Sequence, residues 1–202
     1  MIDTESRPLR DVIADSLRGQ IINGTIKPGR RVREEEIALD HGVSRVPVRE
    51  ALQRLAAEGY VDLTPRRGAT VVIPDGRRVL EIMEIRRVLE VHAVRRAALA
   101  RGGSVAKQLS AIVDHKDQVP TLVEEFHDLV AVASGNVELV QLLRQIRTKI
   151  RWMLEGDRDE RATASRDDHR RVLEAILGGD EGEAARQLDA HLLGDEAHYR
   201  NL

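Results

Sequence analysis

EEEIALDHGVSRVPVREALQRLAAEGYVDLTPRRGATVVI, residues 34–73, is the stretch that decides the fold of the first part of the chain. It contains a helix, a tight turn, a second helix that carries arginines, and a hairpin that carries two more. Gly42 stands at the turn, where a left-handed backbone is easy for glycine. Ser44 is placed to cap the second helix, and Pro47 falls in its first turn, where the missing N–H of proline is not needed. This order predicts a winged helix-turn-helix, which is a DNA-binding fold.

The second helix of this stretch has an apolar face and a polar face. Its apolar residues recur at helical spacing and are expected to face the core. They are Val48, Ala51, Leu52 and Leu55. The opposite face carries Arg45, Arg49 and Gln53. A guanidinium fork matches the two major-groove acceptors of guanine, and a glutamine amide can pair with adenine, so this face is predicted to read bases. The alternative is an ordinary solvated basic face.

Two short runs, residues 60–63 and 69–73, are rich in Val, and a turn that contains Arg66 and Arg67 joins them. The pattern predicts a hairpin with cationic residues at its tip. Directly after a recognition helix, these arginines would lie over a phosphate strand or in a minor groove. Alternatively, they are charges that only improve solubility.

The composition is compatible with a cytoplasmic DNA-binding protein. The chain has 202 residues, 42% of them hydrophobic but with only one Trp, two Tyr and one Phe, so its cores must be aliphatic. The formal net charge is −2, and there is no cysteine, which excludes disulfides and thiolate metal sites. No apolar run resembles a membrane helix or a signal peptide, so we expect a cytoplasmic location and no membrane partner.

The segment Pro74-Asp75-Gly76 favours a turn after the last strand, and the rest of the chain reads as helical. Amphipathic segments span residues 77–101, 105–119, 121–134, 137–155, 163–177 and 181–199. The charged residues 157–168 are either a loop or the start of a helix. The sequence therefore predicts a mostly α protein with two domains. Residues 1–74 form a winged helix-turn-helix with three helices and a β-hairpin wing, and residues 75–202 form an all-α bundle of about six helices.

Three histidines lie on apolar faces of three different helical segments: His127, His169 and His191. Each is one helical turn from aliphatic residues, so each is expected to point inward. Three imidazoles from three helices of one bundle could bind a shared divalent metal such as zinc, nickel, copper or iron. The alternative is a hydrogen-bonded polar network in the core.

The N-terminal motifs resemble the GntR family of bacterial transcription regulators. They are INGTIKPG at 22–29, VSRVPVREALQRLAAEGYV at 43–61 and PRRGATV at 65–71. The resemblance implies DNA contacts from the recognition helix, its flank and the wing. The positions that match are Ser44, Arg45, Val46, Arg49 and Gly68 with its neighbours. Many members place another base-contacting arginine where this chain has Glu35, with Arg33 nearby.

The C-terminal motifs resemble the FCD domain of the FadR-like branch of this family. They are EIRRVLE at 84–90, EFHDLVAVASGN at 125–136, DHRRVLEAILGGD at 168–180 and HL at 191–192. The resemblance implies a dimerising helical bundle with a pocket for a small carboxylate effector, often beside a divalent metal. Effector binding in such proteins usually releases DNA.

The resemblance also assigns an effector residue and the metal ligands. Arg86 would face the pocket and grip the carboxylate of the effector, as a guanidinium fork can. The alternative for Arg86 is an exposed pair with Glu90, four residues on. Metal-binding members have an aspartate where this chain has Val123, so the site would consist of His127, His169 and His191, with Glu124 as a further candidate, and would hold zinc or nickel.

Together these features predict a cytoplasmic transcription regulator that acts as a repressor. They also predict that it is not an enzyme. It would bind a pseudo-palindromic DNA operator as a homodimer and respond to an organic acid. One alternative is a metal-dependent enzyme built on the three histidines, with Glu124 or Glu125 as a general base. Another is a DNA-binding protein that needs no ligand.

Overall fold

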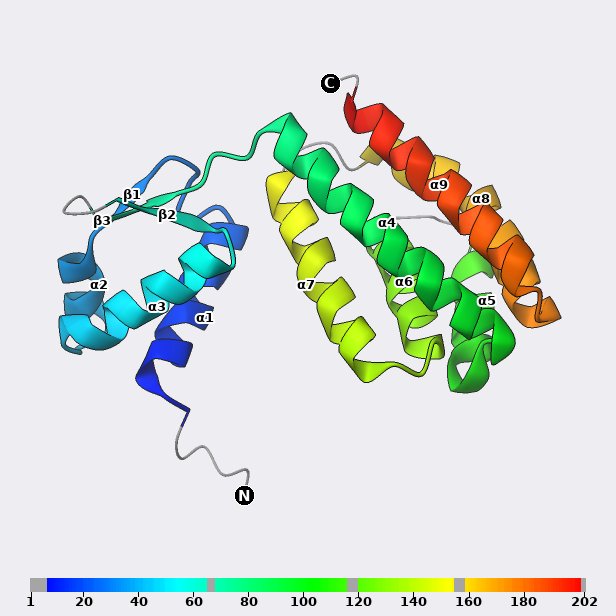
Figure 1. The fold of residues 1–202 in the computed structure, drawn as a ribbon, viewed down its shortest axis with the longest axis horizontal. Helices are drawn as coiled ribbons and strands as arrows, with labels where there is room; N and C mark the ends of the chain where they lie inside the picture. Colours follow the sequence, from blue (N-terminus) through cyan, green and yellow to red (C-terminus); the bar gives the residue numbers. More distant parts are fainter. Residues whose placement is uncertain (1–6, 65–67, 116–119, 155–158, 201–202) are drawn as a thin grey trace. The chain divides into compact units, whose positions relative to one another are not determined.

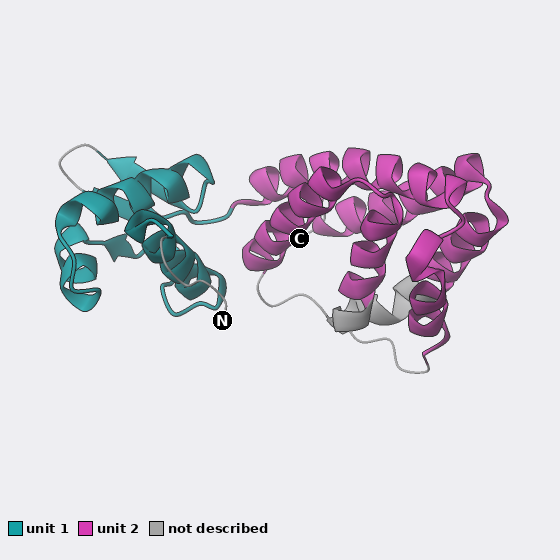
Figure 2. Ribbon diagram, turned by 90° about the horizontal axis from the view of Figure 1, so that it is seen from below, with its two compact units in different colours: residues 1–74 teal, residues 75–202 magenta. Residues whose placement is uncertain are grey.

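The computed structural model describes residues 7–64, 68–115, 120–154 and 159–200, with side chains left aside for 120–122 and 159–166. The chain divides into two compact units, Met1–Pro74 and Asp75–Leu202, shown in two colours in Figure 2. Arg66 and Arg67, at the tip of the predicted wing, lie outside the described residues.

The first unit is a winged helix-turn-helix, as predicted. Its elements are α1 (Leu9–Ile22), β1 (Arg31–Val32), α2 (Glu34–Asp40), α3 (Arg45–Ala57), β2 (Val61–Thr64) and β3 (Gly68–Val71). Helix α3 packs on α1 and α2, and it buries its aliphatic face, including Val48 and Leu55. At the turn between α2 and α3, Gly42 has a φ of 64°, the left-handed conformation expected for it.

The sheet of this unit has one strand more than the sequence predicts. The strand order is β1-β3-β2, with both neighbouring pairs antiparallel. Strand β1 is only two residues long and pairs Arg31 with Thr70 and Val32 with Ala69. It places the chain just before α2 against the base of the wing. Ser44 does stand at the N-cap of α3, but its side chain makes no capping hydrogen bond.

The second unit is an all-α bundle, and its helices follow the predicted segments closely. They are α4 (Gly76–Leu99), α5 (Ala106–Asp114), α6 (Pro120–Ala133), α7 (Val137–Met153), α8 (Asp159–Gly178) and α9 (Glu181–Arg200), with a short 3-10 turn η1 (Gly103–Val105) before α5. The charged segment contributes the start of α8. Three of the helix starts have side-chain caps, because Asp75 accepts from the N–H of Arg78, Asn136 from that of Leu139 and Asp180 from that of Glu183.

Helix α4 is the centre of the bundle. It contacts α6, α7, α8 and α9, and Figure 1 shows α9 running along it. The main core is aliphatic, as the composition requires, with Phe126 of α6 fully buried in it. Because α6, α8 and α9 all pack against α4, residues on their inner faces are brought close together. Among the helices described, none combines the length and apolar character needed to cross a lipid bilayer.

Candidate functional sites

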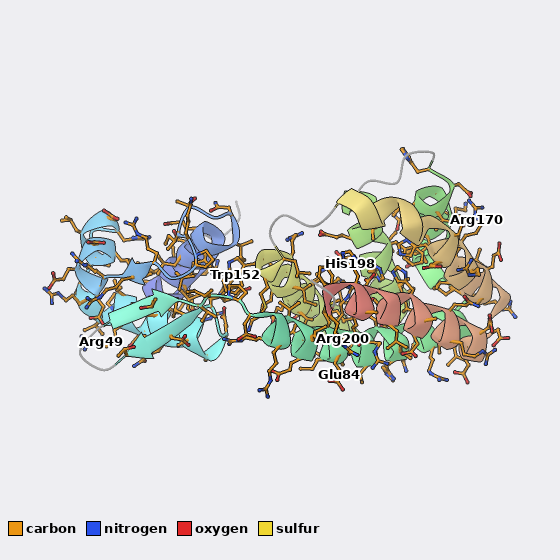
Figure 3. The ribbon with its side chains drawn as sticks, turned by 90° about the horizontal axis from the view of Figure 1, so that it is seen from above. Arg49, Glu84, Trp152, Arg170, His198 and Arg200 are labelled. Carbon is orange, nitrogen blue, oxygen red and sulfur yellow. The ribbon has the colours of Figure 1, made fainter. Side chains whose placement is uncertain are left out.

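The DNA-reading candidates share one exposed face of α3. Side chains of Arg45 and Arg49 are 61% and 62% exposed, and Val46 is 64% exposed. Ser44 and Gln53 are also exposed. Figure 3 labels Arg49 on this unit. The side chains predicted to meet base edges are therefore accessible, while the other face of α3 is buried.

The remaining candidates flank this face. Arg33 is the residue before α2 and pairs with Glu36 at 3.4 Å. Gly68 begins β3 with a φ of 84°, a left-handed conformation that disfavours other residues. A Cβ at Gly68 would meet the carbonyl oxygen of Val32 at 3.5 Å, which is ordinary contact, so the constraint on this glycine is its backbone angle.

The two arginines of the reading face each have a carboxylate partner on α2, which the sequence did not reveal. Arg49 forms a two-pronged pair with Glu34, with Nε to Oε1 at 3.1 Å and Nη2 to Oε2 at 2.8 Å. Arg45 Nη2 lies 2.7 Å from Oε1 of Glu35. The hydrogen bonds from Arg49 lower the pKa of Glu34. If both arginines read bases as predicted, DNA has to replace these internal partners.

The three predicted histidines meet in the interior of the bundle. His127 comes from α6, His169 from α8 and His191 from α9, and all three are buried. One nitrogen of each ring lies within 4.8 Å of one nitrogen of the others. The ring centroids are 5.1 Å apart for His127 and His169, 5.5 Å for His127 and His191, and 4.9 Å for His169 and His191.

Hydrogen bonding leaves several of these nitrogens available to a ligand. His127 donates from Nδ1 to Oε2 of Glu90 at 2.6 Å, and His191 donates from Nδ1 to Oδ2 of Asp168 at 3.1 Å. Nε2 of His191 and both ring nitrogens of His169 are buried without a hydrogen-bond partner among the described residues. Buried polar atoms without partners are rare and call for an explanation.

The histidine cluster fits a metal ion. Burial lowers the pKa of His127 and that of His169, so both rings are held neutral, which is the form that binds metals. An ion lies about 2.0–2.1 Å from an imidazole nitrogen. The centroid of each ring lies about 1.1 Å beyond its ligating nitrogen, so two imidazoles at the tetrahedral angle around one ion have centroids about 5.2 Å apart. The three observed separations bracket this distance.

A charged residue, Glu90, lies beside the cluster, a position that the sequence did not reveal. It is 2% exposed, and its Oε1 accepts from Nε of Arg86 at 2.8 Å and from Nη1 of Arg147 at 3.2 Å. Burial alone would raise the pKa of Glu90, but the positive charges of Arg86 and Arg147 and the hydrogen bond from His127 hold it well below its usual range. The carboxylate is therefore ionised in the interior.

Arg86 lies inside the bundle and already has acidic partners. Its side chain is 12% exposed, and its Nη1 is also 3.7 Å from Oδ2 of Asp195. The alternative of an exposed pair with Glu90 is wrong, because both side chains are shielded from solvent. The adjacent Arg87 points elsewhere and binds Asp189 and Glu196.

Glu124 does not join the histidines in this structure. Its Oε2 accepts from Nη1 of Arg151 at 2.6 Å. Among the described residues, the group of side chains that could hold a metal consists of the three histidines and does not include Glu124. Glu124 lies three residues before His127, but its carboxylate pairs with Arg151 of α7 instead. Val123, four residues before His127, is half-buried and has no ligand atom to offer.

Comparisons with known proteins agree for both units. The model of bacterial regulatory proteins of the gntR family matches residues 9–71, and that of the FCD domain matches residues 81–194. The chain is 30% identical to the HTH-type transcriptional regulator YdhC of Bacillus subtilis, over 93% of this chain and 89% of that protein. It is also 30% identical to the Nta operon transcriptional regulator of Aminobacter aminovorans, over 82% of each.

A solved structure shares the fold of the whole chain. McbR/YncC of E. coli superposes with a TM-score of 0.70 over 97% of this chain and 99% of that one, at 21% identity. The chain therefore belongs to the GntR family of bacterial transcription regulators, and its second domain is an FCD domain. It is a DNA-binding regulator, and the expectation that it is not an enzyme is confirmed by its family.

We expect Arg45→Ala and Arg49→Ala each to cost about 1–3 kcal/mol of specific DNA binding, because each removes a side chain placed to read a base. Preference at one position of each half-site should weaken as well. Selection from randomised duplexes followed by titration of the selected site measures both effects.

Arg54→Ala is the matched control, since Arg54 lies on the same helix but pairs with Asp11 and Glu58, away from the reading face. It should leave the base preference unchanged. An unaltered preference in the Arg45→Ala and Arg49→Ala variants would show that α3 does not read bases.

Proposed function

We propose that the protein is a homodimeric repressor that binds a pseudo-palindromic operator and is released by a small carboxylate bound in its FCD domain. In this proposal, a divalent metal held by His127, His169 and His191 forms part of the effector site. The observation that carries it is the convergence of three buried imidazoles near Arg86, several of whose nitrogens have no hydrogen-bond partner in the described part of the chain. Since the ligand is DNA, the proposed location is the cytoplasm.

The dimer follows from what one α3 helix can read. A single recognition helix contacts only a few base pairs, so two helices related by a two-fold axis are needed for useful specificity in a genome. A dimer across a promoter would also exclude polymerase, which is the basis for proposing repression.

The stoichiometry on DNA tests this part of the proposal. In analytical ultracentrifugation, we expect two chains on one selected duplex and a two-chain species without DNA. One chain on each duplex, with a monomer in free solution, would rule out the dimer.

The proposed metal ligands suit zinc or nickel, because imidazole nitrogen is a good ligand for both. Three protein ligands leave a coordination position for water or for an oxygen of the effector. Such an ion would bind the effector by attracting its carboxylate. Arg86 is the proposed second partner of that carboxylate, and it would exchange part of its contact with Glu90 and Asp195 for the ligand.

Zinc should raise the melting temperature of the metal-free protein, since an ion that joins three helices stabilises only the folded chain. A ligand at 100 times its dissociation constant adds about 2.7 kcal/mol to the free energy of unfolding. His169→Ala should abolish most of this shift, as measured by thermal unfolding with and without zinc.

His92→Ala is the control for this experiment, because His92 is exposed on α4 and should not affect zinc binding. Val123→Asp should bind zinc more tightly than the wild type by adding a carboxylate one helical turn before His127. Metal analysis that finds no zinc on the wild-type protein after incubation would leave the histidines as a polar core network.

Arg86→Met should abolish the response to the effector while the protein still folds and binds DNA. The substitution removes the charge partner of the ligand, and Glu90 keeps Arg147 and His127 as partners. A thermal-shift screen of organic acids on the wild type identifies the probe, and its release of DNA is then measured in each variant.

Arg87→Met is the matched control, because it removes the neighbouring arginine, which pairs with Asp189 and Glu196 on α9. Its response should equal that of the wild type. An undiminished response in Arg86→Met would place the effector elsewhere.

A further inference from the structure

Among the side chains that the structure describes, Glu90 is the one fully buried carboxylate in contact with the histidine cluster, and the proposed function gives it no role. Each of its oxygens has a distinct set of partners. Oε2 accepts the short hydrogen bond from Nδ1 of His127, at 2.6 Å, and Oε1 accepts from Arg86 and Arg147. The side chain therefore joins the histidine cluster to the arginines on α4 and α7.

The hydrogen bond to Glu90 selects one form of His127. A neutral imidazole carries its proton on one nitrogen and a lone pair on the other. Because the carboxylate can only accept, the proton must lie on Nδ1, and the lone pair must lie on Nε2. Metal-binding histidines commonly make such a bond through their second nitrogen, which orients the ring and makes it a stronger ligand.

Charge gives Glu90 a second effect on the site. Three neutral imidazoles bring no negative charge to a divalent ion, and Val123 brings none either. An unpaired ion is costly in a buried place. Asp168 makes a similar contact with His191, but at 3.1 Å, with 33% of its side chain exposed and with Arg171 as another partner. Glu90 is more shielded and closer to its histidine.

We propose that Glu90 is the positioning residue of the three-histidine site. It holds His127 with the proton on Nδ1, so that Nε2 faces the ion, and it supplies from behind the ligand the negative charge that Val123 cannot supply. This inference rests on the proposed metal site. The competing role for Glu90 is purely structural, namely to neutralise Arg86 and Arg147.

The proton position on His127 can be measured without any substitution. In metal-free protein with ¹⁵N-labelled histidine, long-range ¹H–¹⁵N spectra near neutral pH should show His127 protonated on Nδ1 only. The His127→Gln variant assigns the signal. A ring protonated on Nε2 would overturn the proposal, whether or not the protein binds zinc.

Glu90→Gln tests the effect of the charge. The amide keeps the shape of the side chain and can still accept from Nδ1, but it is neutral. We expect the affinity for zinc to fall about 10–100-fold, as it does when a partner of a metal-bound histidine is removed. Titration with zinc in competition with a chelator of known affinity gives the value.

Asp128→Asn is the matched control. It removes one negative charge from the same network of ion pairs, because Asp128 binds Arg147, but it contacts no imidazole. Its zinc affinity should stay close to that of the wild type. Equal losses in Glu90→Gln and Asp128→Asn would mean that Glu90 acts only through the stability of the network, which contradicts the proposal.

The variant could fail to fold, because it leaves Arg86 short of a partner. In that case Arg86→Met combined with Glu90→Gln removes one charge of each sign and is titrated instead. Wild-type affinity in a folded variant that lacks Glu90 would overturn the proposal. If the wild type itself binds no zinc, the proposed metal site fails and this role of Glu90 fails with it, whereas zinc binding that does not depend on Glu90 would overturn this inference alone.

Discussion

A carboxylate that ionises inside a bundle cannot remain without partners. Removing it from water costs several kcal/mol, which only well-placed hydrogen bonds and opposite charges offset. Glu90 of α4 obtains them from Arg147 on α7, from His127 on α6 and from Arg86 one turn back on its own helix. Aliphatic faces alone would tolerate some sliding of these helices along one another. The donors of Glu90 must reach two particular oxygens, so they set the register of α4, α6 and α7 and, with it, the place of the first histidine.

Most of the fold could be predicted because its signals are local. Each signal depends only on residues that are close in the sequence. Examples are the helical spacing of Val48 and Leu55, the turn at Gly42 and the amphipathic segments of the bundle. Strand β1 could not be predicted in this way, because Arg31 and Val32 form a strand only by pairing with Thr70 and Ala69. The missing capping bond of Ser44 is similar, since the sequence shows a suitable residue but not the direction of its hydroxyl.

The same distinction between local patterns and long-range packing separates the site residues that could be predicted from those that could not. His127, His169 and His191 could be found because each lies on an apolar helix face, and the packing around α4 then brings them together. Glu90 entered the sequence analysis only as an alternative, exposed partner of Arg86, because a spacing of four residues on one helix looks the same whether that face meets water or α6 and α7. The partners of Arg45 and Arg49 were missed for a related reason. Glu35 and Glu34 reach them only through the crossing angle of α2 and α3, which no local pattern encodes.

The acids behind the reading face also change how many ions accompany DNA binding. A protein that neutralises phosphates displaces the cations condensed on the duplex, and its affinity falls with salt in proportion to their number. If Arg45 and Arg49 read bases as predicted, they enter this exchange already paired with Glu35 and Glu34. When the guanidinium groups turn to base edges, two carboxylates lose their partners beside a polyanion and must attract cations from solution. For an interface of this kind, we expect the number of counterions released to be smaller than the number of arginines implies, because the carboxylates take up cations as the arginines leave them.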